Sequence, residues 1–536
     1  MVLIIYILEW LALAASCFVL TEELLRDLMM MQQNSYRNER YSRWLEESKD
    51  STSGWRLCGI IVLLLSLTTF CGRIPGMSLV TIFGIAAGVT LMMAKYKKPL
   101  VMTPRAKRLF IAEIAVCVVI ILIAMLIAVI ATHLSIDVLR YAVTATLGLY
   151  CLSHVVTLFA NRLMAGREKR INDSFTDDAR RILASMPGLK VVGITGSYGK
   201  TTTKHYLQTI LSQQYETLMT PGSYNTPMGV VRTVRELLKP YHEVFICEMG
   251  AKNVGDIREI CDIVHPYAGI ITAVGPQHLE SFRTIDNVRA TKFELADALG
   301  ADGAVVVNDD FEKIADRPVK NTTAIRYTVE GSEASDYHAE NIKYSPEGTS
   351  FTIVGPEGWR MDVTTPVVGK ANISNILAAV AMARFLGVED RNISYALAHL
   401  PQVEHRLAIR RVPGGLTIID DAFNSNPVGS SMALDVLEGM SSGKRYLVTP
   451  GMIELGDEEY ELNRRFGEHA AKAADVVVVV GRYNRAAITE GLKDGGFPEN
   501  ATIIADSFAA AQAYITSHAR PGDIVLYEND LPDTFK

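Results

Sequence analysis

Long apolar stretches dominate the first 160 residues, and short apolar runs separated by mixed stretches fill the rest of the chain. A helix that crosses the hydrocarbon core of a bilayer needs about 20 mostly apolar residues. Five stretches approach that length, and the fourth carries a single charge, Glu113, near its edge. The pattern therefore predicts a multi-pass α-helical membrane region of about five transmembrane helices, at residues 2–20, 55–71, 77–94, 109–131 and about 136–160.

The charges between these stretches predict the orientation of the spans. Lys and Arg number five in residues 21–54, six in 95–108 and four in 161–170, against one in 72–76 and none in 132–135. Because segments rich in Lys and Arg stay on the cytoplasmic side, five spans with the N-terminus outside place the three basic segments in the cytoplasm. We therefore expect a protein of the inner (cytoplasmic) cell membrane with cytoplasmic C-terminal domains.

Beyond residue 170 the pattern changes to near-continuous apolar runs that alternate with helical stretches. One series lies at 190–194, 244–247, 269–274 and 304–307, and a second at 416–419, 445–448, 476–480, 502–504 and 523–526. Strands that are apolar throughout and separated by helices are typical of parallel sheets covered on both faces. Residues 321–366 alternate and contain turns, which predicts an antiparallel β insertion.

A glycine-rich turn follows the strand at 190–194 and precedes a helix. Backbone N–H groups at such a helix N-terminus point towards a bound phosphate. Lys200 would neutralise phosphate oxygens, and the Thr201 hydroxyl would bind Mg²⁺. Ile194 occupies the first glycine position of the pattern GxxxxGK[ST], so the loop is a shorter form. We expect ATP to bind through Thr195, Gly196, Ser197, Tyr198, Gly199, Lys200, Thr201 and Thr202.

These patterns divide the 536 residues into three parts. We predict a membrane region at 1–170 and a central ATP-binding domain at 171–400, with a P-loop ATPase-like parallel sheet and a β insertion. A smaller Rossmann-like C-terminal domain follows at 401–536. The fold class is thus a membrane region followed by two α/β domains. The net charge of −6 gives no reason to expect nucleic acid as a partner.

The loop sequence TGSYGKTTT resembles the short phosphate loop of the Mur ligases, which build the peptide stem of peptidoglycan, and that of folylpolyglutamate synthase. Four further segments resemble the Mur ligases, and within that family the branch that adds a dipeptide. They are GSYNTPMG at 222–229, EMGA at 248–251, DDAFNSNP at 420–427 and GMIELG at 451–456. The resemblance implies an ATP-dependent, ADP-forming ligase. Such an enzyme phosphorylates an acceptor carboxylate and then joins it to an amine.

The resemblance also implies a metal site and a modified lysine. Glu248, which follows the strand 244–247, completes with Thr201 a Mg²⁺ site. His278 helps to hold a second Mg²⁺, although a loop histidine taken alone is usually a surface residue. Lys292 corresponds to a lysine that is carbamylated in several Mur ligases. The alternative is an exposed helix lysine that pairs with Glu294 or another neighbour.

Other residues take nucleotide and substrate roles by the same resemblance. Asn372 and Asn375 are expected at the adenine, or alternatively as helix caps, in a segment where Ala371 replaces the usual histidine. Arg406 is expected to reach the γ-phosphate when the domains close. Asp421 resembles the carboxylate that binds the ATP ribose, although a buried turn alone also explains such a run. Further candidates are Asn424 at the nucleotide and Ser223, Asn225 and Thr226 at the substrate. The expected catalytic residues are Lys200, Lys292, His278 and Arg406.

Two features depart from the family, and both concern substrate recognition. Soluble Mur ligases begin with a domain that binds the UDP-sugar, where this chain has predicted spans. The members it resembles most usually end with a Lys-Gly-Ser segment, where this chain has LYENDLPD at 526–533. We therefore expect the lipid bilayer as a partner. The acceptor carboxylate is small-molecule or, by hypothesis, lipid-linked or polymeric, and the amine belongs to an amino acid or dipeptide.

Two other functions stay open at this point. One is a polyglutamate-type synthase, which can also carry N-terminal membrane segments. The other is a non-catalytic membrane scaffold that binds ATP. The intact polar set of Lys200, Thr201, Glu248, His278 and Lys292 argues against a scaffold, because such clusters usually mark function.

Overall fold

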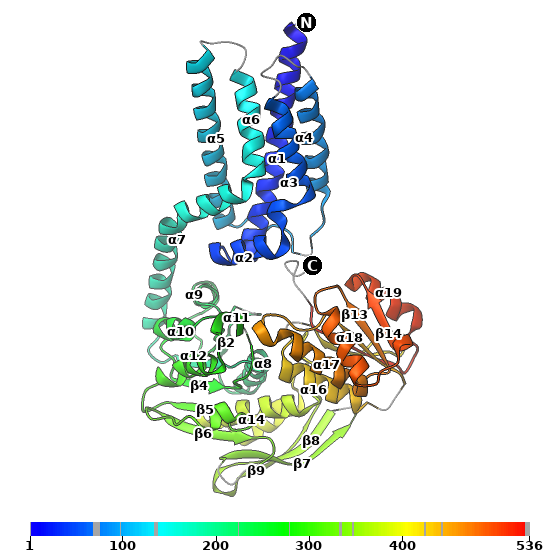
Figure 1. Ribbon diagram of the computed structural model, residues 1–536. Helices are drawn as coiled ribbons and strands as arrows, with labels where there is room; N and C mark the ends of the chain where they lie inside the picture. The colour runs from blue at the N-terminus through cyan, green and yellow to red at the C-terminus, as the bar shows by residue number, and fades with distance from the viewer. Residues whose placement is uncertain are drawn as a thin grey trace. The chain divides into compact units, whose positions relative to one another are not determined.

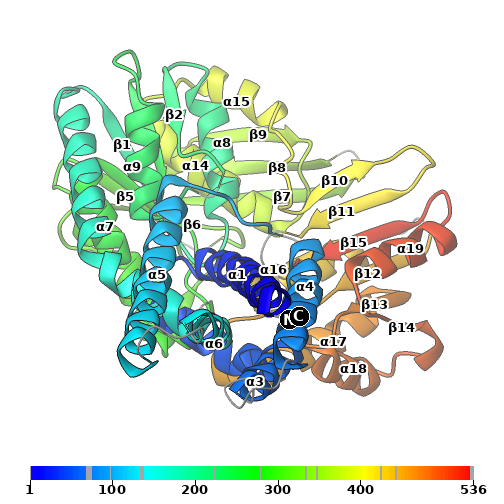
Figure 2. The ribbon, with the colours of Figure 1, turned by 90° about the horizontal axis from the view of Figure 1, so that it is seen from above.

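The structure is a computed structural model with two compact units, Met1–Asn172 and Asp173–Asp530 (Figures 1 and 2). It describes residues 2–67, 75–96, 98–132, 138–222, 224–277, 279–331, 335–345, 348–422, 425–440 and 443–530. The described part of the first unit is helical. The second unit contains two sheets.

Two helices of the first unit, over Ile4–Gln33 and Pro104–Ile130, are long and apolar enough to cross a membrane. The fifth predicted span is not one straight helix, because α6 and α7 meet at a bend of 79°. Helices α3 and α4 are apolar but shorter. Five spans therefore stay a prediction. The helices are α1 Val2–Gln33, α2 Asn38–Ser48, α3 Gly54–Leu67, α4 Pro75–Met93, α5 Pro104–Thr132, α6 Val138–Cys151 and α7 Ser153–Ala184.

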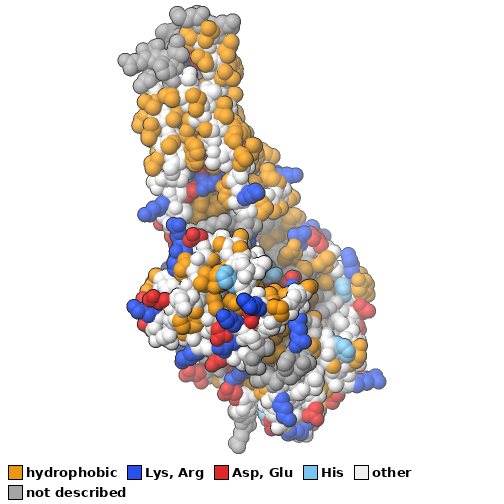
Figure 3. Space-filling model, turned by 90° about the vertical axis from the view of Figure 1, so that its right-hand side faces the viewer, with side chains coloured by type: hydrophobic (Ala, Val, Ile, Leu, Met, Phe, Trp, Pro, Cys, Tyr) orange, Lys and Arg blue, Asp and Glu red, His pale blue; other side chains and the backbone are white. Residues whose placement is uncertain are grey.

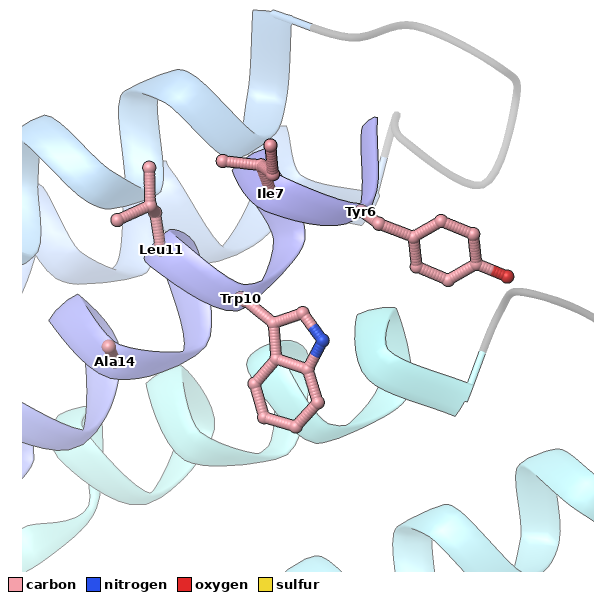
Figure 4. A pocket seen from close by; sticks show the side chains of 5 residues that line it. All are labelled: Tyr6, Ile7, Trp10, Leu11 and Ala14. Carbon is pink, nitrogen blue, oxygen red and sulfur yellow. The ribbon is translucent and has the colours of Figure 1, made fainter. Parts of the chain in front are cut away.

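The face of these helices seen in Figure 3 is largely apolar. On α5, Ile111, Leu122 and Ile130 are 66%, 57% and 69% exposed. A contiguous apolar surface of this kind is typical of contact with a membrane or with another protein. A shallow hollow on α1 (Figure 4) is also apolar and contains no charged side chain that would bind phosphate. Its lining residues are Tyr6, Ile7, Trp10, Leu11 and Ala14.

The interior of the bundle holds a buried ion network that the apolar pattern did not predict. The Arg56 guanidinium of α3 lies 2.7 Å from Glu23 and 2.9 Å from Asp27, both on α1. It also donates to the Ser153 hydroxyl at the start of α7, at 2.9 Å, and Asp50 lies 3.5 Å away. Removing one partner would leave a buried charge uncompensated. These contacts therefore hold α1, α3 and the α6–α7 bend together.

Helices α1 and α4 pack closely because two glycines lie four residues apart on α4. A Cβ on Gly84 would lie 2.6 Å from the carbonyl oxygen of Ala15, and a Cβ on Gly88 would overlap the ring of Phe18. Small residues at this spacing let membrane helices approach each other.

We expect Gly84→Leu to destabilise the bundle by about 1–3 kcal/mol, because the larger side chain forces the two helices apart. Thermal unfolding of the purified protein in lipid nanodiscs measures the loss. Gly148→Leu is the matched control, since a Cβ on Gly148 meets no atom within 4 Å. Equal losses in both variants would contradict the packing argument.

The second unit begins with a nine-stranded sheet in the order β2-β3-β1-β4-β5-β6-β7-β8-β9. Strands β2 to β7 pair in parallel, as the sequence predicted, and β7, β8 and β9 pair antiparallel. The predicted insertion at 321–366 is therefore not a separate element, because it continues the main sheet and its first strand is parallel. The strands are β1 Lys190–Thr195, β2 Thr217–Met219, β3 Val244–Glu248, β4 Ala268–Ile271, β5 Ala304–Asn308, β6 Thr323–Thr328, β7 Tyr337–Ser345, β8 Gly348–Val354 and β9 Arg360–Thr365.

Helices cover both faces of this sheet, which is why its central strands are apolar throughout. One core contains α8, α14 and α15, and the other contains α9, α10 and α12. The helices are α8 Lys200–Leu211, α9 Pro227–Glu236, α10 Asp256–Val264, α11 Leu279–Phe282, α12 Ile285–Asp297, α13 Glu312–Ala315, α14 Lys370–Phe385 and α15 Asp390–Ala398.

The second sheet has six strands in the order β10-β11-β15-β12-β13-β14. Only β10 is antiparallel to its neighbour, so the predicted parallel α/β arrangement is confirmed. The domain boundaries at 170 and 400 stay predictions. The elements are β10 Ala408–Arg411, β11 Thr417–Asp421, α16 Pro427–Glu438, β12 Arg445–Thr449, α17 Glu459–Ala473, β13 Val476–Val480, α18 Arg485–Asp494, β14 Thr502–Ala505, α19 Phe508–His518 and β15 Ile524–Glu528.

Candidate active site

Three parallel strands, β1, β3 and β4, end side by side where the glycine-rich loop begins. Ile194 lies opposite Glu248 in register, and Thr195 lies opposite Ile271. The loops at the carboxyl ends of central parallel strands form the ligand site in sheets of this kind. The topology thus brings Glu248 to the start of α8, although 47 residues of sequence separate Glu248 from Thr201.

The loop itself is a tight turn that depends on two glycines. The Ser197 N–H donates to the Ala273 carbonyl at 2.8 Å. Gly199 has a φ of 79°, in the left-handed region that favours glycine, and Gly196 has a φ of 151°. A Cβ on Gly196 would also collide with the side chain of Thr272. The turn brings the N–H groups at the start of α8 to the sheet edge, where an anion is stabilised.

Lys200 is the first residue of α8. Its ammonium donates to the carbonyl oxygens of Gly196 at 2.6 Å and of Ser197 at 3.3 Å. Burial lowers the pKa of Lys200 to about 8, and the Glu248 carboxylate opposes that shift. A lysine held over the loop can direct its charge to phosphate oxygens, so its place fits the predicted role.

Glu248 is 1% exposed, and three polar side chains contact its carboxylate. The Thr201 hydroxyl lies 3.1 Å away, the Lys204 ammonium 2.9 Å and the Asn225 amide 3.0 Å. Burial alone would raise the pKa of Glu248. The charges of Lys204 and Lys200 lower that pKa by more than burial raises it, so the carboxyl stays ionised. Carboxylate and hydroxyl oxygens are donors that Mg²⁺ prefers, so Glu248 and Thr201 fit the expected ion.

Lys204 is a site residue that the motif analysis missed. Its side chain is fully buried, and its ammonium bridges Glu248 and the Gly222 carbonyl, the latter at 2.7 Å. Lys204 lies one helical turn after Lys200, so the two side chains share a face of α8. That spacing was the one hint in the sequence, but it does not place Lys204 beside Glu248.

Lys292 lies on α12 and is 2% exposed, so the alternative of an exposed helix lysine is wrong. Glu294 accepts instead from the backbone N–H groups of Gly255 at 2.8 Å and Arg258 at 2.9 Å. Burial and then the charge of Lys200 lower the pKa of Lys292 to about 7. A carbamate forms from a neutral amine, so this environment meets the requirement for the predicted modification.

The Arg406 guanidinium interacts electrostatically with a carboxylate of each sheet. Burial lowers its pKa, while the carboxylates of Asp421 in the second sheet and Glu248 in the first raise it. A second link between the sheets is the ion pair of Lys252 and Glu454, at 3.1 Å. The structure therefore brings Arg406 within electrostatic range of the phosphate loop.

An acid pair lies where β11 and β15 end. Asp421 is opposite Glu528 in register, and Glu528, which is 1% exposed, accepts from the Ser425 hydroxyl at 2.6 Å. Burial raises the pKa of Asp421 to about 6, and burial together with the charge of Asp421 raises the pKa of Glu528 well above its usual range. The altered C-terminal segment thus supplies a carboxyl that holds a proton beside Asp421.

We expect Glu528→Gln to weaken the loss of stability at alkaline pH. Both pKa values are raised on folding, so the folded state holds more protons than the unfolded state above about pH 4. Stability is therefore lost as the pH rises from there through the folded pKa values. The amide cannot ionise and can still accept from Ser425. Melting temperatures between pH 5 and pH 9 measure how steeply stability falls as the pH rises. The exposed Glu438→Gln is the control, and equal slopes in both variants would refute the assignment.

The two asparagines predicted at the adenine are bonded to α8. The side-chain oxygen Oδ1 of Asn372 accepts from the Tyr206 hydroxyl at 2.8 Å, and Oδ1 of Asn375 accepts from the Thr203 hydroxyl at 3.1 Å. Neither asparagine is the N-cap residue of α14, which is Gly369, although the Asn372 side-chain amide also donates to the Val368 carbonyl at 2.8 Å. Asn372 and Asn375 join α14 to α8, and their contact with the base stays a prediction.

The remaining candidates lie around the same loop. The Thr195 hydroxyl donates to the Met249 carbonyl at 2.9 Å, and the Tyr198 hydroxyl to the Pro276 carbonyl at 3.1 Å. Thr202 is buried, and Thr226 caps α9. Their roles stay predictions. Ser223, His278 and Asn424 lie outside the described residues.

The sequence matches two domain families. Residues 194–383 match the Mur ligase middle domain, and residues 405–527 match the Mur ligase, glutamate ligase domain. The UDP-N-acetylmuramoyl-tripeptide–D-alanyl-D-alanine ligase of Bacillus subtilis is 30% identical over 347 residues, which cover 64% of this chain and 73% of that enzyme. The enzyme of the same name from Escherichia coli is 33% identical over 318 residues, covering 59% and 70%.

Solved structures agree with these matches. MurF from Acinetobacter baumannii has a TM-score of 0.60 and 27% identity, covering 67% of this chain and 77% of that one. MurF ligase from Thermotoga maritima in complex with ADP has a TM-score of 0.59 and 25% identity, covering 67% and 80%. With the phosphate loop, Glu248 and two α/β sheets in the expected order, the chain belongs to the Mur ligase family, whose members are ATP-dependent, ADP-forming ligases.

Proposed function

We propose that this protein is a membrane-anchored ligase of peptidoglycan or cell-envelope synthesis that joins an acceptor carboxylate to an amine through an acyl phosphate. The observation that carries the proposal is the cluster at the start of α8. There Lys200, Thr201 and Lys204 surround the ionised Glu248 within reach of the phosphate loop. Such a cluster suits a site that binds ATP and neutralises transferred phosphate.

In the first half-reaction, an oxygen of the acceptor carboxylate attacks the γ-phosphorus of ATP. The bond to the bridging oxygen breaks, and ADP leaves. Lys200 and Arg406 would neutralise the negative charge on the phosphate oxygens, and the loop N–H groups would orient them. Mg²⁺, when held by Thr201 and Glu248, supplies further charge neutralisation.

In the second half-reaction, the amine nitrogen attacks the acyl carbon. The tetrahedral intermediate expels phosphate, and the nitrogen loses a proton. Water competes with the amine for the acyl phosphate, so the site must exclude it. The ion pair of Lys252 with Glu454 joins loops of the two sheets, and closure of those loops over the site would exclude water.

The acceptor is proposed to be presented at the bilayer. The relatives are named for a UDP-N-acetylmuramoyl-tripeptide acceptor and a D-alanyl-D-alanine amine. In this chain the matched domains begin at residue 194, and the preceding helices include two that are long and apolar enough to span a membrane. An anchored enzyme meets a lipid-linked acceptor at the surface where that acceptor resides.

Mass spectrometry of the products tests the proposal. The purified full chain in nanodiscs receives ATP and either a UDP-linked or a lipid-linked peptide acceptor, with D-alanyl-D-alanine or single amino acids as amines. We expect amide product and ADP with the lipid-linked acceptor, and about 10²–10³-fold slower formation of both with Lys200→Ala. Efficient turnover of the UDP-linked acceptor alone would contradict the proposal that the acceptor is lipid-linked.

The same assay separates the other candidate functions. Repeated addition of glutamate would indicate a polyglutamate-type synthase. ATP binding without amine-dependent phosphate release would indicate a non-catalytic scaffold.

A further inference from the structure

The segment that carries Arg406 has an uncommon backbone. His405 and Leu407 have φ values of 58° and 52°, so a left-handed residue flanks Arg406 on each side. Side chains with a Cβ rarely adopt this region, and for a bulky residue such as Leu407 it is a strained conformation. Such strain persists only where surrounding contacts hold it.

Two contacts with the end of β11 hold this turn. The His405 Nδ1 lies 2.9 Å from the Asp420 carboxylate, and the Leu407 N–H donates to Asp421 Oδ1 at 3.0 Å. Asp420 and Asp421 are consecutive residues whose side chains point to opposite faces of the strand. Each of the two carboxylates therefore holds one end of the turn.

The charges that face the imidazole are few. Glu404 lies 3.9 Å from Nε2, and Asp420 accepts at Nδ1. The Arg410 guanidinium lies 3.7 Å from Asp420 and 3.5 Å from Glu404. His405 and Arg410 both contact Asp420, but only His405 lies in the turn 405–407. Loss of the imidazole therefore removes a contact between the turn and β11 that Arg410 cannot replace.

We propose that His405 and Asp420 form a positioning pair that holds the turn 405–407 and so aims Arg406 at the phosphate end of the ATP site. The pair acts through Arg406 and touches no reacting atom. Arg406 already lies within electrostatic range of Lys200 and Glu248. The inference rests on the proposed function for the phosphate contact of Arg406.

A double-mutant cycle between His405→Ala and Arg406→Ala tests the pair. Each variant of the full chain is assayed for ligation and for affinity towards ADP and a non-hydrolysable ATP analogue. We expect His405→Ala and Asp420→Ala to lower kcat and analogue affinity about tenfold, with ADP affinity little changed. In the Arg406→Ala background, His405→Ala should cost nothing further, because coupled residues are not additive. A loss of equal size in both backgrounds would overturn the proposal.

Two more variants at position 405 separate the pair from the turn. Asn adopts the left-handed region and can donate to Asp420, so His405→Asn should retain most activity. His405→Gly relieves the backbone but removes the contact, so it should be as impaired as His405→Ala, and wild-type activity there would also overturn the proposal. Arg410→Ala is the matched control and should change neither readout. If the wild type binds the analogue but ligates no acceptor, the proposed function fails while the binding cycle still decides the role of His405.

Discussion

Lys200→Ala is expected to lower the rate of amide ligation by about 10²–10³-fold, the usual loss when one charge-stabilising donor is removed from a transition state. The ammonium lies 2.6 Å from the Gly196 carbonyl at the start of α8, where the loop N–H groups also converge. Lys204 cannot take over this role, because its ammonium is bound to Glu248 and to the Gly222 carbonyl. Steady-state ADP release with saturating acceptor and amine measures the loss.

Lys190→Ala is the matched control for this variant. Lys190 lies at the opposite end of β1, is exposed, and contacts the ring of Tyr267 at 5.7 Å. Its removal should leave kcat unchanged. Ligation at the wild-type rate by Lys200→Ala would refute the phosphate assignment of the whole loop.

Lys292→Ala is expected to lower activity by about 10–100-fold, the range typical of lost support for a metal site. We propose that CO₂ adds to the neutral amine of Lys292 and that the resulting carbamate is anionic. Burial lowers the pKa of this lysine to about 7, so the neutral form dominates above that pH and is lost below it. Activity in buffers of low CO₂ content should therefore fall as the pH drops through 7.

Two measurements decide this assignment. Protein incubated with ¹³C-bicarbonate should give a carbamate carbon signal that Lys292→Ala lacks, and a short carboxylate such as acetate should partly restore the variant. Lys313→Ala is the control, because Lys313 is 41% exposed and pairs with Asp286 at 3.4 Å. An exposed pair of this kind contributes little. Full activity in CO₂-depleted buffer together with no carbon signal would refute the carbamate.

The ATP site was more predictable than the substrate site. The phosphate loop and its helix are consecutive in sequence, so the glycine spacing and the strand before it were enough to locate them. Residues whose partners lie far away in the sequence were harder to predict. Lys204 became visible only when β3 brought Glu248 next to α8, and the Asn372 and Asn375 bonds to α8 depend on the packing of α14.

The first unit also had features that the sequence predicted and features that it did not. Hydropathy located apolar helices, because a run of apolar residues has the same meaning wherever the chain goes. It could not predict the Arg56 network, whose partners come from α1, α3, the turn before α3 and the start of α7. Nor did it predict the bend between α6 and α7.

Short consecutive patterns were enough to predict the family, the ATP chemistry and the two parallel α/β sheets. Tertiary structure alone decided that Lys292 is buried, that Glu528 shares its site with Asp421, and that His405 holds the turn beside Arg406. The physical reason is that a pKa or a strained backbone depends on desolvation and on charges brought in from distant residues. Those distances are set by strand order and register, which no local pattern contains.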